Sequence, residues 1–148
     1  MVSIPDLKVQ LEKSRHELSH MLDMMPEDKM EFRPGEQAKS AAELVRHLAG
    51  CEAWQAELAQ KGSAPFPPVD LAAECKDKER LKRCLDEVRS RTLAALDAIP
   101  SERLAEVETM PWGEEMSIGE SLCYMPYHEG WHSGQIAYIQ TILGIMGF

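Results

Sequence analysis

The chain has 148 residues, of which 44% are hydrophobic, so it can form one substantial core but is too short for two domains of ordinary size. We therefore expect a single domain over residues 1–148. The formal net charge of -9 argues against binding to a nucleic-acid backbone or an anionic membrane, because both would repel an acidic chain, and leaves small molecules as the expected partners.

The first predicted helix runs from about Pro5 to Met25. Proline suits an opening turn because the N–H that it lacks is not needed there, and Pro26 ends the segment. The apolar residues cluster around one direction when each position is advanced by about 100° around the axis, whereas His16 and His20 point the opposite way. We expect these two histidines to face water.

The second predicted helix follows Ser40 and continues to about Lys61. Ser40 as N-cap with Glu43 three residues later is the pattern of a capping box. The apolar face consists of Leu44, Leu48, Cys51, Trp54 and Leu58. Because His47 lies within about 40° of the centre of that face, its imidazole is expected to point inward.

The third predicted helix is amphipathic, carries many charges and ends before Pro100. Its apolar positions are Leu81, Leu85, Val88, Ala95 and Leu96. The fourth begins at Ser117, where Glu120 completes a second capping box, and runs to about Leu143, with Gly144 as the C-cap. The capping residues and the prolines at the helix ends therefore predict four helices.

Two histidines of the fourth helix, His128 and His132, lie four residues apart and therefore share one face. Both fall within about 60° of the direction of the apolar stripe, so we expect them to face the core. Pro126 removes one backbone hydrogen bond just before them and should bend the axis. The bend either aims the histidines or only wraps the helix around its neighbours.

The connections between the helices indicate the topology. Three of them exceed about ten residues, which is longer than an up-and-down bundle needs, so some are expected to cross the bundle. The segment 110–116 places Trp112 beside a turn, where it either caps a pocket or plugs the structure. With no strand alternation visible, the predicted fold class is all-α, a single four-helix bundle with long crossover connections.

The stretch from His128 to His132 matches H-E-x-x-H, the zinc-protease signature. Those enzymes take a third ligand from an acidic residue or a histidine after the motif, and this chain has neither after His132. The glycine of the longer metzincin motif is replaced by Gln135. A zinc-protease site is therefore excluded, and any third ligand must come from upstream.

Three inward histidines in one small interior favour a metal site formed by His47, His128 and His132. A single buried imidazole is usually a hydrogen-bonded core residue, but three without partners would be costly to desolvate. A divalent cation that takes one lone pair from each offsets that cost and keeps a fourth position open. Cys51 lies one turn beyond His47 and could approach the ion, but we interpret it as a small apolar filler and leave it out of the site.

The sequence resembles the DinB/YfiT-like family of four-helix bundles over most of its length. The resemblance is carried by residues 25–28, 32–35, 40–48 and 52–54, and by 116–120, 128 and 132–136. In that family one histidine of the second helix and two of the last bind a divalent metal. The resemblance therefore implies a ligand role for His47, His128 and His132, in agreement with the helical projection.

Three neutral imidazoles leave a divalent ion its full charge and an open position, where a water can titrate near about pH 7 or a thiolate can bind. Zinc or nickel is the expected metal. The resemblance implies thiol S-transfer first, with a low-molecular-weight thiol as cosubstrate, and metal-dependent hydrolysis second. The alternatives are a non-catalytic metal-binding stress-response module and a purely structural bundle without metal.

Two glutamates are candidates for supporting roles. Glu129 is the nearest candidate for a general base or for an acceptor behind the ligands, and the alternative is a carboxylate at the surface or rim. Glu43 lies one turn before His47 and could orient that imidazole, but the capping box competes for its side chain. The sequence leaves both roles open.

The remaining expectations concern location and assembly. No apolar run approaches the roughly 20 residues of a membrane span, and the first residues lack the pattern of a secretory signal. A cytoplasmic protein without membrane contact is therefore expected, with the four cysteines reduced because none form a Cys-x-x-Cys pair. The family resemblance and the apolar tail over 145–148 favour a homodimer, unless the tail folds back on its own bundle.

Overall fold

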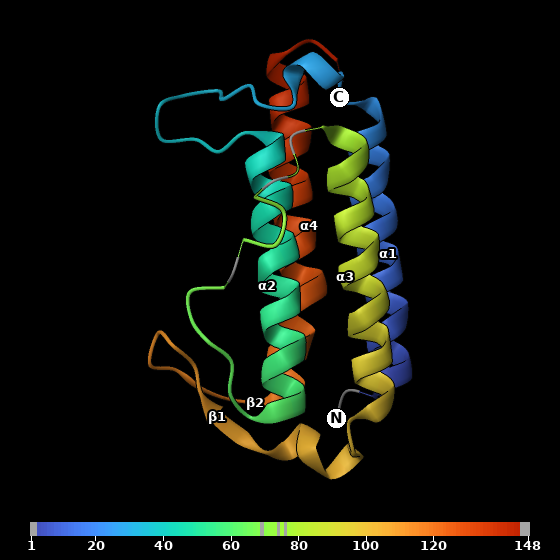
Figure 1. Cartoon of the computed structure of the whole chain (residues 1–148), viewed down its shortest axis with the longest axis vertical. Coiled ribbons are helices and arrows are strands. Elements are labelled where there is room, and N and C mark those ends of the chain that lie inside the picture. Colours follow the sequence, from blue (N-terminus) through green and yellow to red (C-terminus); the bar gives the residue numbers. More distant parts are fainter. Residues whose placement is uncertain (1–2, 69, 74, 76, 146–148) are drawn as a thin grey trace.

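The computed structural model describes residues 3–68, 70–73, 75 and 77–145. Its helices α1 (Ile4–Met24), α2 (Ala41–Lys61), α3 (Lys78–Ala98) and α4 (Ile118–Ile142) lie side by side in one bundle, as Figure 1 shows. The minor elements are the 3-10 helices η1 (Glu27–Lys29) and η2 (Ser101–Ala105) and the strands β1 (Val107–Thr109) and β2 (Glu115–Ser117). The predicted all-α fold class is confirmed.

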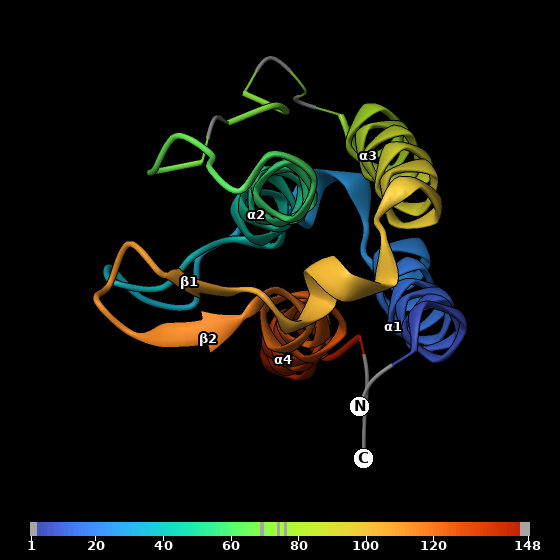
Figure 2. The ribbon, with the colours of Figure 1, turned by 90° about the horizontal axis from the view of Figure 1, so that it is seen from below.

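The order of the helices differs from a simple up-and-down bundle. In Figure 1, α1 and α4 run in one direction, whereas α2 and α3 run in the other. Seen along the bundle in Figure 2, α1 lies next to α3 and α4, and α2 also lies next to α3 and α4. The connections from α1 to α2 and from α3 to α4 therefore cross the bundle diagonally, as expected for some of the three long connections. The third, from α2 to α3, joins neighbouring helices.

Both predicted capping boxes are present. Ser40 Oγ accepts a hydrogen bond from the N–H of Glu43, whose carboxylate accepts one from the N–H of Ser40 at 2.8 Å. Ser117 and Glu120 exchange the same pair of bonds at the start of α4. These reciprocal bonds satisfy N–H groups that the first helical turn leaves without partners, so the two helices that carry the candidate histidines begin at fixed points.

Two apolar clusters, one toward each end of the bundle, form the core. The first contains Leu18, Leu22, Leu48, Leu81, Leu85, Ile136 and Ile139 among others. The second contains Leu7, Leu11, Trp54, Leu58, Leu96, Leu122 and Met125 among others. Along every helix the two sets are separated at about the same level, which leaves a polar layer between them.

The polar layer consists of four buried charged residues, one from each helix: Arg15, Glu52, Arg89 and Glu129. Arg15 donates to Glu129 at 2.6 Å and to Glu52 at 2.8 Å. Arg89 donates to Glu52 at 2.7 Å and to Glu129 at 2.9 Å. Each guanidinium therefore bridges both carboxylates, so the four charges are paired and all four helices are tied at one level.

A short hairpin precedes α4 and was not predicted from the sequence. Strands β1 and β2 pair antiparallel with Val107 opposite Ser117, and each has only three residues, too few to show an alternating pattern. Trp112 in its turn lies 6.2 Å from Trp54, centroid to centroid. Trp54 belongs to the second apolar cluster, whereas the Trp112 side chain is exposed, so Trp112 packs on the surface of this end of the core and does not plug it.

In the part of the chain that the structure describes, no helix is both long and apolar enough to cross a membrane. Of the apolar tail, residues 146–148 lie outside the described residues. Ile145 is partly buried against the first apolar cluster, and its N–H donates to the carbonyl of Gln140 at 2.9 Å, so this residue folds back on the bundle.

Candidate metal centre

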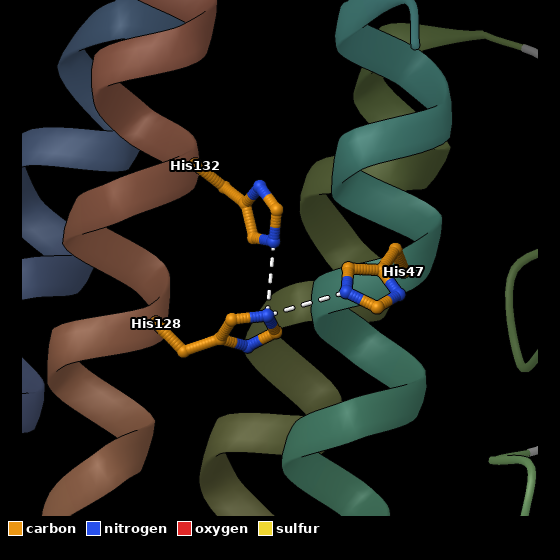
Figure 3. A group of neighbouring side chains, drawn as sticks. All are labelled: His47, His128 and His132. Atoms are coloured by element: carbon orange, nitrogen blue, oxygen red, sulfur yellow. Dashed lines mark hydrogen bonds between the residues drawn. The ribbon is translucent and has the colours of Figure 1, made fainter. Parts of the chain in front are cut away.

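The structure brings three imidazoles together between α2 and α4. Figure 3 shows the rings of His128 and His132 from α4 pointing toward His47 from α2. Nε2 of His128 lies 3.2 Å from Nε2 of His47 and 2.9 Å from Nε2 of His132. One ring nitrogen from each residue lies within 4.8 Å of the other two, and among the described residues no other cluster of histidine, cysteine and carboxylate side chains has this geometry.

The spacing of these nitrogens fits a shared cation. In a tetrahedral site with metal–nitrogen bonds of about 2.05 Å, neighbouring ligand nitrogens are about 3.3 Å apart. The two short separations, 3.2 Å and 2.9 Å, are close to that value. A single proton on Nε2 of His128 can satisfy only one of these contacts well, whereas a cation would be shared by all three lone pairs.

Gln135 orients one of the rings. Its side-chain oxygen lies 2.6 Å from Nδ1 of His132, which donates the hydrogen bond. With the proton on Nδ1, the Nε2 of His132 carries a lone pair that faces the other two imidazoles. Such an acceptor behind a metal-binding histidine fixes both the tautomer and the ring orientation.

The imidazoles are neutral near pH 7. Burial lowers the pKa of His47 to about 4, with the charge of Lys39 adding to the effect. Burial and the neighbouring imidazoles lower the pKa of His128 to about 4 as well. The pKa of His132 is also lowered by burial, although its bond to Gln135 acts in the opposite direction. All three side chains therefore offer lone pairs at a pH where isolated histidines are partly protonated.

Cys51 lies beside the site without joining it. Its Sγ is 3.6 Å from Nδ1 and 3.7 Å from Nε2 of His47, so the sulfur packs against one ring and does not face all three. Burial raises the pKa of the Cys51 thiol, which keeps it protonated at neutral pH. These contacts agree with the interpretation of Cys51 as a filler outside the ligand set.

Glu129 lies elsewhere than either interpretation of the sequence expected. Its side chain is 3% exposed and belongs to the polar layer, where Arg15 and Arg89 hold both oxygens, so it is no surface or rim carboxylate. Burial alone would raise the pKa of Glu129, but the two guanidinium groups lower it below its ordinary value. A carboxylate held in this way is a weak base, so the geometry does not support a general-base role.

Glu43 serves the helix start and not the candidate ligand. Its carboxylate accepts from the backbone of Ser40 and from Arg33. The competition noted in the sequence is therefore decided for the capping box. His16 and His20, the other pair with the same spacing, are exposed on α1, as helical projection predicted.

Two cavities adjoin the imidazoles. One, of about 840 Å³, includes His47, Cys51 and Arg46 in its wall. The other, of about 640 Å³, includes His132, Trp131 and Tyr138. Lys39 lines both, and each cavity has one of the candidate ligands in its wall, so a small molecule in either one would lie next to an imidazole. The arrangement suits a reaction centre better than a closed structural site.

Sequence comparison identifies a family. The model of the DinB superfamily matches residues 10–136, a span that includes all three histidines. Among curated proteins, no significant match to the sequence was found.

Solved structures share the fold at low sequence identity. YfiT from Bacillus subtilis, described as a probable metal-dependent hydrolase with an unusual four-helix bundle topology, is 15% identical with a TM-score of 0.78 over 97% of this chain and 91% of its own. The mycothiol-dependent maleylpyruvate isomerase is 11% identical with a TM-score of 0.70, over 91% of this chain but 61% of the isomerase. Identities this low establish the fold alone.

A third structure overturns one prediction. The colibactin self-resistance protein ClbS is 16% identical over 94% of this chain and 96% of its own, with a TM-score of 0.70, and was crystallised in complex with double-stranded DNA. The exclusion of nucleic acid from the net charge of -9 is therefore wrong as a general argument for this fold. Net charge averages over the whole surface, whereas contacts to phosphates depend on the local arrangement of charges.

Proposed function

The chain belongs to the DinB superfamily, and on this premise we propose that it is a metal-dependent enzyme whose metal ligands are His47, His128 and His132. One observation carries the proposal: three neutral imidazoles converge, and two of them, His47 and His132, each line a cavity. When bound, the ion would act as a Lewis acid that lowers the pKa of a coordinated thiol or water.

The chain's own residues have defined parts in this proposal. Gln135 holds the proton on Nδ1 of His132 and so keeps Nε2 available. The helix positions that bring His47 opposite His128 are fixed by the capping boxes and by the polar layer. The two cavities supply space for reactants next to the imidazoles.

Thiol S-transfer is the preferred reaction, with a low-molecular-weight thiol as cosubstrate. A thiolate requires no general base on the protein once its pKa has been lowered, and Glu129, the nearest candidate base, is held by two arginines. Two separate cavities beside one site also suit a reaction between a thiol and an acceptor. The isomerase that shares the fold is named as dependent on a thiol, mycothiol.

Hydrolysis is the second candidate, favoured by the description of YfiT as a probable metal-dependent hydrolase. A non-catalytic metal-binding module would need a fourth protein ligand to close the site. Among the described residues, no further histidine, cysteine or carboxylate joins the three imidazoles, and this speaks against a closed site. Zinc or nickel as the metal, a homodimeric assembly and a cytoplasmic location stay predictions from the sequence.

Activity with simple probes tests the proposal. Protein loaded with zinc or nickel is assayed with cysteine or coenzyme A as the thiol and monochlorobimane as the electrophile, and separately with p-nitrophenyl acetate and water. We expect conjugation of the thiol, lost on chelation and in His47→Ala, but retained in His16→Ala, which changes an exposed histidine. Ester hydrolysis without conjugation would favour the second candidate, and the absence of both activities in metal-loaded protein would contradict an enzyme of either kind.

A further inference from the structure

Lys39 lies in the wall of both cavities that adjoin the candidate metal centre. It precedes Ser40, the N-cap of α2, and it is the one residue that lines both cavities. Its charge lowers the pKa of all three histidines and of Cys51. The ammonium group therefore acts on the whole site and not on one cavity alone.

The neighbouring cations already have anionic partners, and Lys39 does not. Arg46 donates to Glu31 at 2.6 Å, and Arg33 forms an ion pair with Glu43. Within the described ranges, no carboxylate lies within ion-pair distance of the Lys39 ammonium group. Lys39 is thus an exposed positive charge in the wall of both cavities, without a carboxylate partner among the described residues.

The positive charge near the three histidines favours the binding of an anion. If the proposed function holds, three neutral ligands leave the ion its double positive charge, and Lys39 adds a third charge close by. Lys39 is exposed, so water screens part of this repulsion, and a bound anion between Lys39 and the half-buried histidines would relieve the rest.

The residues around the site also restrict the kind of anion. A phosphate dianion is usually bound by several donors, often arginines or a run of backbone N–H groups, whereas Lys39 is the one cationic side chain among the described residues that line the smaller cavity. A monoanion such as a carboxylate fits these surroundings better.

The lining of the smaller cavity indicates the chemistry of the rest of the ligand, beyond its charged group. Its wall is largely apolar and aromatic, with Pro34, Leu44, Trp131, Tyr138 and Ile139 around Lys39 and His132. Such a lining suits an apolar or aromatic body, while the few polar groups fix its orientation. The cavity therefore fits an amphipathic molecule with its charged end toward the histidines.

We propose that Lys39 binds the carboxylate of a small amphipathic substrate whose apolar body lies against Trp131 and Tyr138, next to the metal-binding histidines. This assignment deepens the proposed function and rests on it for the reaction. The binding of the carboxylate, however, depends on Lys39 and can be measured with or without metal.

Calorimetric titration of phenylacetate, an aromatic monocarboxylate, tests this assignment in metal-free and in zinc-loaded protein. We expect the wild type to bind phenylacetate and to bind the neutral phenylacetamide at least about tenfold more weakly, since a charge-assisted bond is lost. Lys39→Met should weaken phenylacetate binding by about tenfold, and Lys39→Arg should restore it to within about threefold. Lys13→Met, which removes an exposed lysine of α1, should leave it unchanged.

Each contrary result overturns the assignment. Equal affinity for phenylacetate and phenylacetamide, wild-type binding by Lys39→Met, or no binding by the wild type would contradict a carboxylate site at Lys39. Tighter binding of phenyl phosphate would contradict the choice of a monoanion. Failure of the protein to bind zinc, together with Lys39-dependent phenylacetate binding in metal-free protein, would refute the proposed metalloenzyme while leaving this site in place.

Discussion

Arg89 of α3 donates to Glu129 of α4 at 2.9 Å, one residue from the imidazole of His128. The same guanidinium donates to Glu52 of α2, five residues after His47, at 2.7 Å and 3.0 Å. One buried arginine thereby links the two helices that carry the candidate ligands. The spacing of the three imidazoles thus depends on charges that lie behind them in the core.

Substitution Glu129→Gln should destabilise the fold strongly. It leaves Arg15 and Arg89 in the core with half of their compensating charge, and breaking a buried ion pair in this way costs about 3 kcal/mol of unfolding free energy. Chemical denaturation of the metal-free protein measures the effect, with Glu17→Gln on the exposed face of α1 as the matched control. A loss no larger than that of the control would show that the polar layer does not stabilise the bundle.

Substitution Gln135→Leu should weaken zinc binding by about tenfold or more, because His132 loses the acceptor that holds its Nδ1 proton. Gln135→Glu keeps an acceptor at the same place and should retain the affinity. Competition with a chromogenic chelator measures both, and Gln10→Leu on α1 serves as the control for a glutamine lost from the surface. Unchanged zinc affinity in Gln135→Leu would mean that the hydrogen bond does not orient a ligand.

The stability of the metal-free protein should fall as the pH decreases from about 6.5 to about 4. Burial lowers the pKa of His47 and His128 to about 4, below the ordinary histidine value of about 6.5, so the unfolded chain takes up protons first in this range. The stabilisation is complete above the unfolded pKa and is lost as the pH falls through this window.

Denaturation midpoints at a series of pH values compare the wild type with His128→Gln. The variant lacks one of the titrating groups, so its midpoint should depend less steeply on pH between 4 and 6.5. His20→Gln removes an exposed histidine and should reproduce the wild-type slope. Parallel curves for wild type and His128→Gln would indicate that His128 titrates normally in the folded protein.

The helices and the meeting of the histidines could be predicted because both depend on local patterns. Ser40 with Glu43 and Ser117 with Glu120 mark the helix starts by reciprocal bonds within four residues. Helical phase then distinguished inward His47 from outward His16 without knowledge of the neighbouring helices. Local chemistry therefore defined which residues lie on the interior faces.

The polar layer could not be predicted so readily, because it depends on which helices become neighbours. A signal was nevertheless present: Arg15 and Glu129 each lie four residues after a buried apolar residue, Leu11 and Met125, and therefore occupy the interior stripe. Charged residues at such positions need partners from other helices. Applied to Glu129, this argument would have favoured an ion pair over a catalytic base.

The hairpin and the role of Lys39 could not be predicted from the sequence, for a different reason. Strands of three residues are too short for periodicity, and the position of Lys39 depends on the path of a connection without regular structure. Net charge likewise gave a false exclusion of nucleic acid, since a whole-chain sum carries no information on local surfaces.

Zinc titration of the wild-type protein beside His132→Ala, with elemental analysis of both, tests the metal centre most directly. We predict near-stoichiometric metal and a raised melting temperature in the wild type, and the loss of both in His132→Ala. Both should be kept in His20→Ala, which removes an exposed histidine that also lies four residues after another histidine. A wild-type protein that binds neither zinc nor nickel, or a His132→Ala variant that binds them equally well, would contradict the three-histidine metal site.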